Sequence, residues 1–567
     1  QIDLAQAAML AALPNDPVRL DPYRHRAALE QRRRLVLARM LAARAITELQ
    51  ARQAARERVA FLPRRYGILA APHLLFALAA QAAPERARVR TTLDRSLQLF
   101  VETQVREVVA GLSGNDAHDA AALVVDNASG EVLAYAGSPD FFDEAGLGHN
   151  DGVHALRQPG SALKPFLYEQ ALEERLIRPT TILPDVPTAY ALPEARIYRP
   201  NDYSTRFAGP VRVRLALADS LNVPAVKVLE RLGVDRFLER LHELGFRHLT
   251  KPAAYYGLGL TLGAGEVSLY ELAGAYVRLA RGGSPVELST VLGAAPAQPP
   301  RAAAPSWALV SDILSDAHAR AGAFGVDSIL ALPFPAAVKT GTSSDFRDTW
   351  TAGFTRDYTV AVWVGNFDGR PMRGISGVTG AGPLWARIML HLHETREPRG
   401  FDPPRGYVRR PICAESGARP AAGCRAVVWE WLDRGDLARY AKLGPAPLGD
   451  EYDAWLVGQP ERVAAGTRVL FPREGDTFVY GGASSAGTLK FEFSGRSDRD
   501  FDVFVNGRRL SPRGADYLWQ VRPGAFVLAV RGPDGAASVR FSVVPPARFA
   551  RRGFTLAATR GPSARTR

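Results

Sequence analysis

The chain has 567 residues, more than one ordinary domain holds, and this length predicts three or four domains of about 150 residues. Hydrophobic residues make up 47% of the sequence and charged residues 23%, a globular balance that excludes wholesale disorder. The formal net charge of +13 is carried by the two ends: residues 1–100 hold 17 arginines against eight acidic residues, and the last 22 residues hold six arginines and no acid.

These basic ends bear on the class of partner. They would suit contact with an anionic membrane surface or polymer, although a solvated basic helix in an arginine-rich chain is the simpler interpretation. The ends lack an aromatic stacking pattern and any zinc or helix-turn-helix signature, so we expect no nucleic acid partner.

Neither a membrane span nor a leader is visible in the sequence. The most apolar window, 67–83, is interrupted by Pro72 and His73 and is shorter than the roughly 20 residues a helix needs to cross a bilayer. The chain opens on Gln1 and has no signal peptide pattern. We therefore expect a fragment or processed form, with any targeting segment or anchor upstream.

Helices are predicted for the first part of the chain. In residues 1–42 the run LAQAAMLAAL is followed by the breaker PNDP and by a second amphipathic run, which we expect to continue as one basic helix to Arg58. Residues 43–118 are predicted to form a helical linker module, with a helix from Arg95 to Leu112.

The sequence pattern changes from helical to strand-like at residue 119. Two strand-like runs flank Asn127-Ala128-Ser129-Gly130, which predicts a β-hairpin, and helical runs fill residues 161–280. Three further strand-like runs across 336–365 predict an antiparallel meander. Strands at both ends with helices between them indicate an α+β domain over 119–396, whose sheet is built from distant segments.

Two more modules follow. A Pro/Arg-rich boundary begins a connector over 397–460 that contains both cysteines. Short alternating runs over 461–545 predict a small β-sandwich, and a basic tail at 546–567 is expected to be disordered.

Lysine is rare in this chain. Only six of the 71 basic residues are lysines, at positions 164, 227, 251, 339, 442 and 490. Arginine keeps its proton in proteins, whereas a desolvated lysine can become a neutral base. Each lysine is therefore a candidate for amine chemistry.

Three short motifs occur in order along the chain: S-x-x-K at 161–164, S-x-N at 220–222 and K-T-G-T at 339–342. Composition alone would produce about 0.3 of the first, about 0.4 of the second and about 0.03 K-T-G. Each of the first two, taken singly, is more simply a surface serine–lysine pair or a helix end. The three together predict one active site.

The chemistry of a serine nucleophile explains the first spacing. Ser161 follows Pro-Gly and is predicted to start a helix, with Lys164 at i+3 on the same face. Pro165 is tolerated there because first-turn N–H groups have no helical partner. A buried Lys164 beside a second cation, Lys339, would lose its proton and activate the serine hydroxyl.

The other motif residues have auxiliary roles in this interpretation. Ser220 would relay protons and Asn222 would hold a substrate amide. Gly341 would let a ligand lie against the strand edge, where Thr340 and Thr342 offer hydroxyls to a carboxylate.

This set of motifs resembles the active-site serine transpeptidases that bind penicillin. The segments RQPGSALKPFLY, ADSLNVPAV, TLGAGEVSLYELAGAY and VKTGTSSDFRDTWTAGFTRDYTVAVWVGN, with the C-terminal sandwich, are similar to class A penicillin-binding proteins of the 1C branch. The resemblance covers most of residues 1–545. It implies a multidomain protein: an α+β serine transpeptidase with an antiparallel sheet flanked by helices, a helical N-terminal remnant and an all-β C-terminal sandwich.

The same resemblance implies peptidoglycan cross-linking at the periplasmic side of the bacterial inner membrane. Ser161 would attack the D-Ala–D-Ala bond of a stem peptide, expel D-Ala and pass the acyl group to a neighbouring amine. The oxyanion would lie between the backbone N–H groups of Ser161 and Thr342. Stem peptides and β-lactams would be the ligands, with other cell-wall proteins as further partners.

Residues 1–42 resemble only the end of the family's membrane-embedded glycosyltransferase domain. The intact parent is expected to be bifunctional, with the glycosyltransferase site absent from this chain.

The remaining candidate ligands predict neither a metal nor a cofactor. Cys413 and Cys424 lack the further ligands that zinc needs, and in an exported protein they favour a disulfide over two free thiols. The histidines fit no metal-binding spacing with carboxylates and are interpreted as structural or solvent-exposed: His25, His73, His118, His154, His391 and His393.

Two other functions compete with a transpeptidase. A serine β-lactamase shares the motifs, but the chain has no E-x-x-L-N motif to supply a deacylating base and has extra domains at both ends. A non-catalytic scaffold that senses β-lactams is the other alternative, although the intact motifs count against it.

Overall fold

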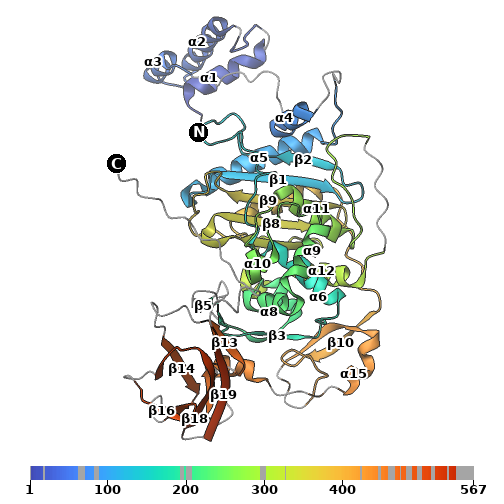
Figure 1. Cartoon of the computed structure of the whole chain (residues 1–567). Helices are drawn as coiled ribbons and strands as arrows, with labels where there is room; N and C mark the ends of the chain where they lie inside the picture. The colour runs from blue at the N-terminus through green and yellow to red at the C-terminus, as the bar shows by residue number, and fades with distance from the viewer. Residues whose placement is uncertain are drawn as a thin grey trace. The chain divides into compact units, whose positions relative to one another are not determined.

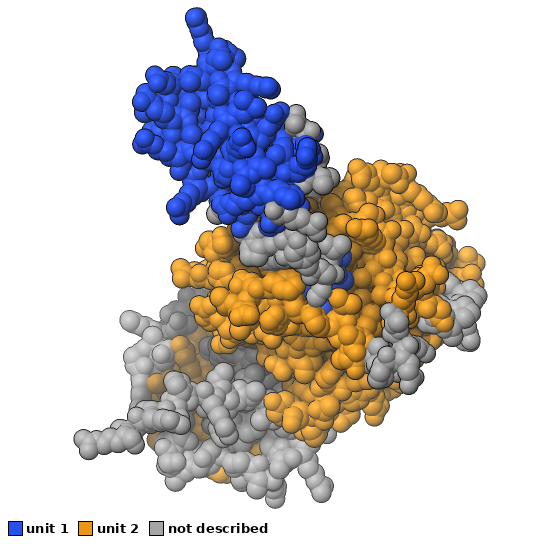
Figure 2. Space-filling model, turned by 90° about the horizontal axis from the view of Figure 1, so that it is seen from above, with its two compact units in different colours: residues 1–72 blue, residues 73–567 orange. Residues whose placement is uncertain are grey.

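The structure is a computed structural model of the chain. It describes residues 2–544 except 17–18, 24, 60, 62–69, 82–87, 192–196, 199–206, 294–301, 326, 422–423, 425, 443, 445–447, 458–466, 473, 480–487, 495–500, 513–516 and 533–534. The chain forms two compact units, residues 1–72 and 73–567 (Figure 2). In the described ranges no helix is both long and apolar enough to cross a membrane. The predicted basic tail, 546–567, lies outside the described residues.

The first unit is a small helical bundle of α1 (Leu4–Ala12), η1 (Leu13–Asn15), α2 (Arg26–Ala42) and α3 (Glu48–Arg56). We expected one basic helix through Arg58, and this was wrong. The chain turns after α2, where Arg44 takes a φ of 56°, and α3 packs back on α2. Buried Arg33 donates to Glu57 O at 3.1 Å. The boundary expected after residue 42 therefore falls inside this unit.

The second unit begins with two helices and the predicted hairpin. These elements are α4 (Pro72–Gln81), α5 (Arg95–Leu112), η2 (Ser113–Asn115), β1 (Asp119–Asp126) and β2 (Val132–Ala136). Gly130, at a φ of 78°, lies in the turn that joins β1 to β2. The hairpin predicted at 127–130 is thus confirmed.

A five-stranded antiparallel sheet forms the centre of this unit, in the order β2-β1-β9-β8-β7 (Figure 1). Its later strands are β7 (Ala337–Thr342), β8 (Asp348–Phe354) and β9 (Tyr358–Gly365), so the predicted meander is also confirmed. Strand β9 pairs with β1 from more than 200 residues earlier, which closes a sheet from distant segments. Strand β7 is left at one edge.

Helices cover both faces of the sheet. On one face, α5 and α14 (Ala381–Leu392) pack over alternate residues such as Ala120, Ala122 and Val124. Because side chains alternate along a strand, α11 (Leu269–Ala280), which also contacts β1, covers the opposite face. As a result, every residue of β1 except Asp126 is buried.

The chain between β2 and β7 supplies the remaining elements of this domain: η3 (Gly160–Leu163), α6 (Lys164–Glu173), β3 (Ile182–Asp185), β4 (Tyr190–Ala191), β5 (Ile197–Tyr198), β6 (Gly209–Arg212), α7 (Val213–Ala218), α8 (Asn222–Leu232), α9 (Val234–Glu243), α10 (Ala253–Tyr256), η5 (Gly257–Leu262), α12 (Pro305–Ser315) and α13 (Ala321–Phe324). The 3-10 turn η6 (Ser344–Phe346) joins β7 to β8. Contacts of η3 with both β7 and η5 bring three sequence-distant segments together.

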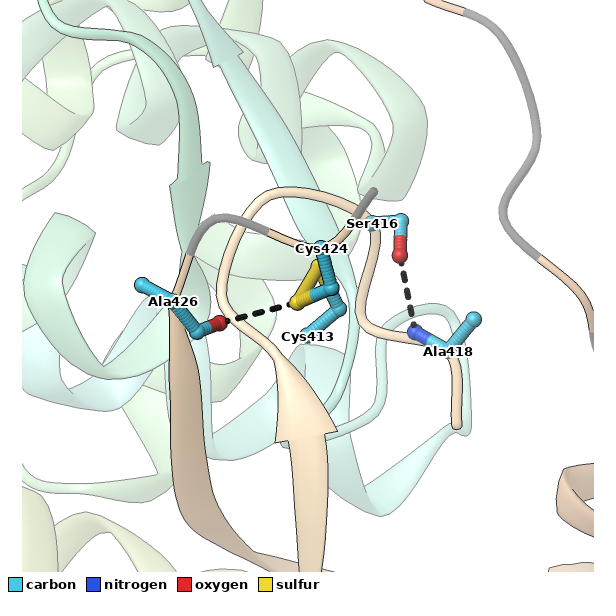
Figure 3. Close-up of a disulfide and its surroundings, with 5 residues drawn as sticks. All are labelled: Cys413, Ser416, Ala418, Cys424 and Ala426. Atoms are coloured by element: carbon cyan, nitrogen blue, oxygen red, sulfur yellow. Dashed lines mark hydrogen bonds between the residues drawn. A yellow bond between two sulfur atoms is a disulfide. The ribbon is translucent and has the colours of Figure 1, made fainter. Parts of the chain in front are cut away.

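A two-stranded hairpin follows the α+β domain. It consists of β10 (Tyr407–Cys413) and β11 (Val427–Asp433), and η7 (Arg434–Asp436), α15 (Leu437–Lys442), η8 (Asp450–Tyr452) and α16 (Asp453–Leu456) come after it. A disulfide joins Cys413 to Cys424 across the loop between the strands, with 5.8 Å between the Cα atoms (Figure 3). These are the two cysteines expected to pair.

The last module is all β. Its strands are β12 (Arg468–Phe471), β13 (Asp476–Val479), β14 (Thr488–Ser494), β15 (Asp502–Val505), β16 (Arg508–Leu510), β17 (Tyr517–Gln520), β18 (Gly524–Gly532) and β19 (Gly535–Val544). They form a three-stranded and a five-stranded sheet that share one apolar core, the arrangement of a β-sandwich. Phe491 and Trp519 of one sheet meet Phe541 of the other in that core.

Candidate active site

The serine of the first motif lies in a turn directly before a helix. Gly160 has a φ of 55°, a left-handed conformation that glycine adopts at little cost, and Ser161 follows it in η3, partly exposed. Helix α6 then begins at Lys164, so Pro165 lies in the first turn, where its missing N–H does no harm. The structure thus places Ser161 one turn before the helix rather than inside it.

Glycines let the edge strand lie directly on this turn. A Cβ atom at Gly160 would overlap the backbone of Thr342, and one at Gly263 would overlap Gly160 itself. We predicted that Gly341 leaves room for a ligand. Its bare Cα instead faces Pro159 O, so its first effect is the close packing of β7 on the turn.

Lys164 is completely buried and points to the second motif. Its Nζ donates to Ser220 O at 2.7 Å, to Leu221 O at 3.0 Å and to Asn222 Oδ1 at 2.7 Å. Ser220 has a φ of 62°, and the turn that it makes brings two successive carbonyls to one amine. The S-x-N residues and the first-motif lysine therefore form one connected group.

Lys339 completes this group from the sheet side. It is 2% exposed, and its Nζ donates to Ser220 Oγ at 2.7 Å and to Thr340 O at 2.8 Å. Burial lowers the pKa of Lys339 well below the ordinary value, and the positive charges of Lys164 and Arg320 lower it further. Ser220 consequently contacts both lysines, one through its carbonyl and one through its hydroxyl.

The two threonines of the third motif differ in position. Thr342 is partly exposed, and its Oγ1 accepts a hydrogen bond from Gly377 N at 3.0 Å. Thr340 is buried, and Gly377 packs closely against it: a Cβ atom added at Gly377 would lie 2.8 Å from the Cβ of Thr340. Of the two hydroxyls predicted to bind a carboxylate, the one on Thr342 is the better placed.

Sequence reasoning missed three residues around this site. Tyr276, fully buried, donates its hydroxyl to Ala162 O at 2.9 Å, and Trp350 donates to Gln158 O at 2.8 Å, so both hold the segment around the serine. Arg320 is the third buried cation, and burial lowers its pKa to about 10. The alanine-rich sequence around Arg320 contains no motif that could have identified it. Tyr276, in contrast, lies in one of the segments that carry the family resemblance.

This geometry suits nucleophilic acyl transfer. It combines a hydroxyl in the turn before a helix, a buried amine at the start of that helix, a hydroxyl that contacts a second amine, and an edge strand whose last residue, Thr342, is partly exposed.

Comparisons with known proteins agree with this geometry. Residues 120–389 match the family described as the penicillin-binding protein transpeptidase domain. The chain is 32% identical over 470 residues to penicillin-binding protein 1C of Escherichia coli, covering 82% of this chain and 59% of that protein. It is 30% identical over 313 residues to penicillin-binding protein 1A of Neisseria gonorrhoeae, covering 51% and 37% respectively. The chain therefore spans less than two thirds of these relatives.

A solved structure supports the fold. The crystal structure of penicillin-binding protein 1A from Haemophilus influenzae superposes with a TM-score of 0.54 at 20% identity, over 76% of this chain and 86% of that one. The expected α+β transpeptidase fold is thus confirmed.

Proposed function

Since this chain belongs to the penicillin-binding proteins, we propose that it is a peptidoglycan DD-transpeptidase that cross-links stem peptides through an acyl-enzyme on Ser161. The observation that carries the proposal is the group of two buried lysines joined through Ser220, next to the turn that holds Ser161. A buried amine that can exist without its proton is what a serine hydroxyl needs for activation.

In the first step Ser161 Oγ attacks the carbonyl carbon of the penultimate D-Ala while its proton passes to Lys164. The acceptors around Lys164 Nζ, which are Ser220 O, Leu221 O and Asn222 Oδ1, stabilise the positive charge that this transfer creates on the amine. The C–N bond to the terminal D-Ala then breaks, Ser220 gives its hydroxyl proton to the leaving amine, and Ser220 takes up the proton that Lys164 holds. An acceptor amine attacks the resulting ester and loses a proton to Lys164, which returns it to Ser161 Oγ as the ester bond breaks.

Backbone N–H groups stabilise the tetrahedral intermediate in this proposal. Those of Ser161 and Thr342 are the candidates, and the overlap that any Cβ at Gly160 would make with Thr342 supports the choice, because it shows how closely the turn approaches the strand end. Hydrogen-bond donors that are fixed before the reaction stabilise the developing charge more than donors that must reorganise during it.

Two polar groups of the motifs are the candidates for substrate recognition. Asn222 Oδ1 accepts from Lys164, and a contact of Asn222 with a substrate carbonyl would be donated by its NH₂ group. The hydroxyl of Thr342 would bind the terminal carboxylate. A β-lactam presents a carbonyl and a carboxylate in a similar arrangement, which makes it a ligand of the same site.

We extend the proposal to the whole protein. The parent would combine this activity with a peptidoglycan glycosyltransferase at the periplasmic side of the inner membrane, as the resemblance of residues 1–42 implies. Other cell-wall proteins would be its partners.

Labelling with a fluorescent penicillin, followed by the time course of label release, tests the proposal. We expect covalent label that persists for many minutes, because no deacylating base is among the proposed groups. Rapid release would indicate a β-lactamase. Stable label without cross-linking of added stem peptides would indicate the non-catalytic scaffold that senses β-lactams.

A further inference from the structure

A hairpin outside the matched transpeptidase domain is fixed to that domain by buried charges. The connector hairpin, residues 407–433, shares with it a group of three arginines and three carboxylates. These six residues are Arg212 and Arg214 at the β6–α7 junction, Asp312 and Asp316 on and after α12, and Arg409 and Glu430 on the hairpin. Their formal charges cancel, so the cluster carries no net charge.

Glu430 is the centre of the cluster. It is 1% exposed and accepts two hydrogen bonds from Arg214, at 2.9 Å from Nε and 2.7 Å from Nη2, a bidentate geometry that fixes both partners. Arg212 Nη1 lies 3.3 Å from the same carboxylate. From the opposite side, Asp312 accepts from Arg214 Nη2 at 2.7 Å.

Arg214 is six residues before Ser220, and a single short helix joins them. It lies in the first turn of α7, whose end continues into the turn at Ser220 through a hydrogen bond from Leu221 N to Ala216 O at 3.0 Å. At the far end of α7, Asp219 accepts from Ala323 N at 2.9 Å. Displacing Arg214 would therefore move Ser220, since a helix of this length transmits a shift without absorbing it.

The disulfide loop makes a second attachment to the same segment. Gly417, at a φ of 66°, brings its bare Cα against Thr180 O. Figure 3 shows the disulfide between Cys413 and Cys424 and the neighbouring residues Ser416 and Ala418. The neighbouring Thr181 O accepts from Val213 N at 3.2 Å, at the start of α7. Both attachments of the hairpin thus lead to α7.

We propose that the connector hairpin is a positioning element of the active site, in which Glu430 holds Arg214 and thereby sets the position of Ser220 between the two lysines. This inference rests on the proposed function. Buried ion pairs often add little stability compared with apolar packing, but they fix geometry well, which is the property a proton-transfer site needs. Glu430 and Arg214 are positioning residues in this proposal, because their ion pairs are made with each other and with Arg212, Asp312 and Asp316.

Glu430→Gln in the full chain tests the proposal, because it keeps shape and removes charge. Stopped-flow measurements with a fluorescent penicillin separate the dissociation constant of the first complex from the rate constant of acylation. We expect the rate constant to fall about tenfold or more, as small displacements of reacting groups do. The dissociation constant should change less than about threefold, because the groups that bind the carboxylate lie on β7.

Asp433→Asn on the same strand is the matched control. Asp433 forms an ion pair with the largely exposed Arg175 at 3.4 Å and accepts a hydrogen bond from Gly435 N at 2.8 Å. An asparagine oxygen can also accept that hydrogen bond, so this variant should acylate like the parent. Equal rate constants for Glu430→Gln and the parent would overturn the inference, as would an equal loss in the control.

Asp312→Asn decides the question if Glu430→Gln does not fold, since it weakens the hold on Arg214 and leaves Glu430 in place. Slower acylation at an unchanged dissociation constant is expected, and an unchanged rate would overturn the inference. A parent chain that fails to acylate would overturn the proposed function, and this inference with it.

Discussion

Ser220 is the residue on which the proposed chemistry depends most after the nucleophile. Its φ of 62° costs backbone energy that a glycine would avoid, yet it places a carbonyl on Lys164 and a hydroxyl on Lys339. A side chain is required at this position because the contact with Lys339 is made by Oγ. The strained backbone of Ser220 is therefore explained by the hydrogen bond between its hydroxyl and Lys339.

Lys164→Arg should reduce penicillin acylation by about 10²-fold or more although the charge is kept, because a guanidinium cannot give up its proton to become a base. The time course of labelling measures the rate. Lys251→Arg, at an exposed lysine, is the control and should match the parent. Acylation of Lys164→Arg at close to the parental rate would assign the base to another group.

Lys339→Met should change how stability depends on pH. The pKa of Lys339 in the folded chain is well below its unfolded value of 10.5, so the folded state binds fewer protons between these two pKa values. The parent is then stabilised as the pH rises through that window, and the variant lacks this effect. The melting temperature of the parent minus that of the variant should increase from pH 7 to pH 10.

Differential scanning calorimetry at several pH values makes this comparison. A constant difference would show that the pKa of Lys339 is ordinary. Acylation by the variant should also be slower, because Ser220 Oγ loses its donor.

At the scale of elements, α6 carries a second buried charge that the proposed reaction does not use. Glu169 is completely buried, accepts from Ser306 Oγ at 2.8 Å and lies 3.8 Å from Arg240. Burial raises the pKa of Glu169 to about 7, from 4.5, although the hydrogen bond and Arg240 oppose the rise. The charged form is therefore costly at neutral pH.

Glu169→Gln should consequently stabilise the chain more at pH 8 than at pH 4.5. The folded parent binds more protons between the two pKa values, so its stability falls as the pH rises through that window, by up to about 3 kcal/mol. Thermal melting of parent and variant at both pH values measures the difference. Glu173→Gln, one turn along the same helix at a more exposed carboxylate, is the control for the loss of one negative charge from this helix. Equal gains at both pH values would contradict the expected pKa.

Which elements could be predicted depended on whether their signal was local. The hairpin at 127–130 and the meander over 336–365 follow from alternation and turn residues, which act over a few positions. The break between α2 and α3 was missed because arginine-rich sequence continues through Arg44. The contacts that hold the folded-back segment, such as the hydrogen bond from Arg33 to Glu57 O, join residues 24 positions apart.

Part of the candidate site was predictable for a similar reason. The motif residues were found from their spacing, and the structure brings Lys164, Ser220, Asn222 and Lys339 together. The contacts of Arg214 with Glu430 join residues 216 positions apart and have no motif. Such pairs depend on how two elements dock, which spacing along one chain does not encode.

At the scale of the whole molecule, the fold makes the reaction possible by bringing three distant segments to one point. The turn before α6, the turn after α7 and the edge strand β7 meet although they are separated by more than 50 and more than 110 residues. Glycines at 160, 263 and 341 allow that approach. The central claim is that Ser161, at this meeting point, is the nucleophile.

Mass spectrometry of the penicillin-treated chain tests this claim most directly. The parent should gain the mass of one penicilloyl group, and the modification should map to the peptide that contains Ser161. Ser161→Ala, with an unchanged melting temperature, should gain no mass. A penicilloyl group on any other residue of the parent, or on the Ser161→Ala chain, would contradict the account.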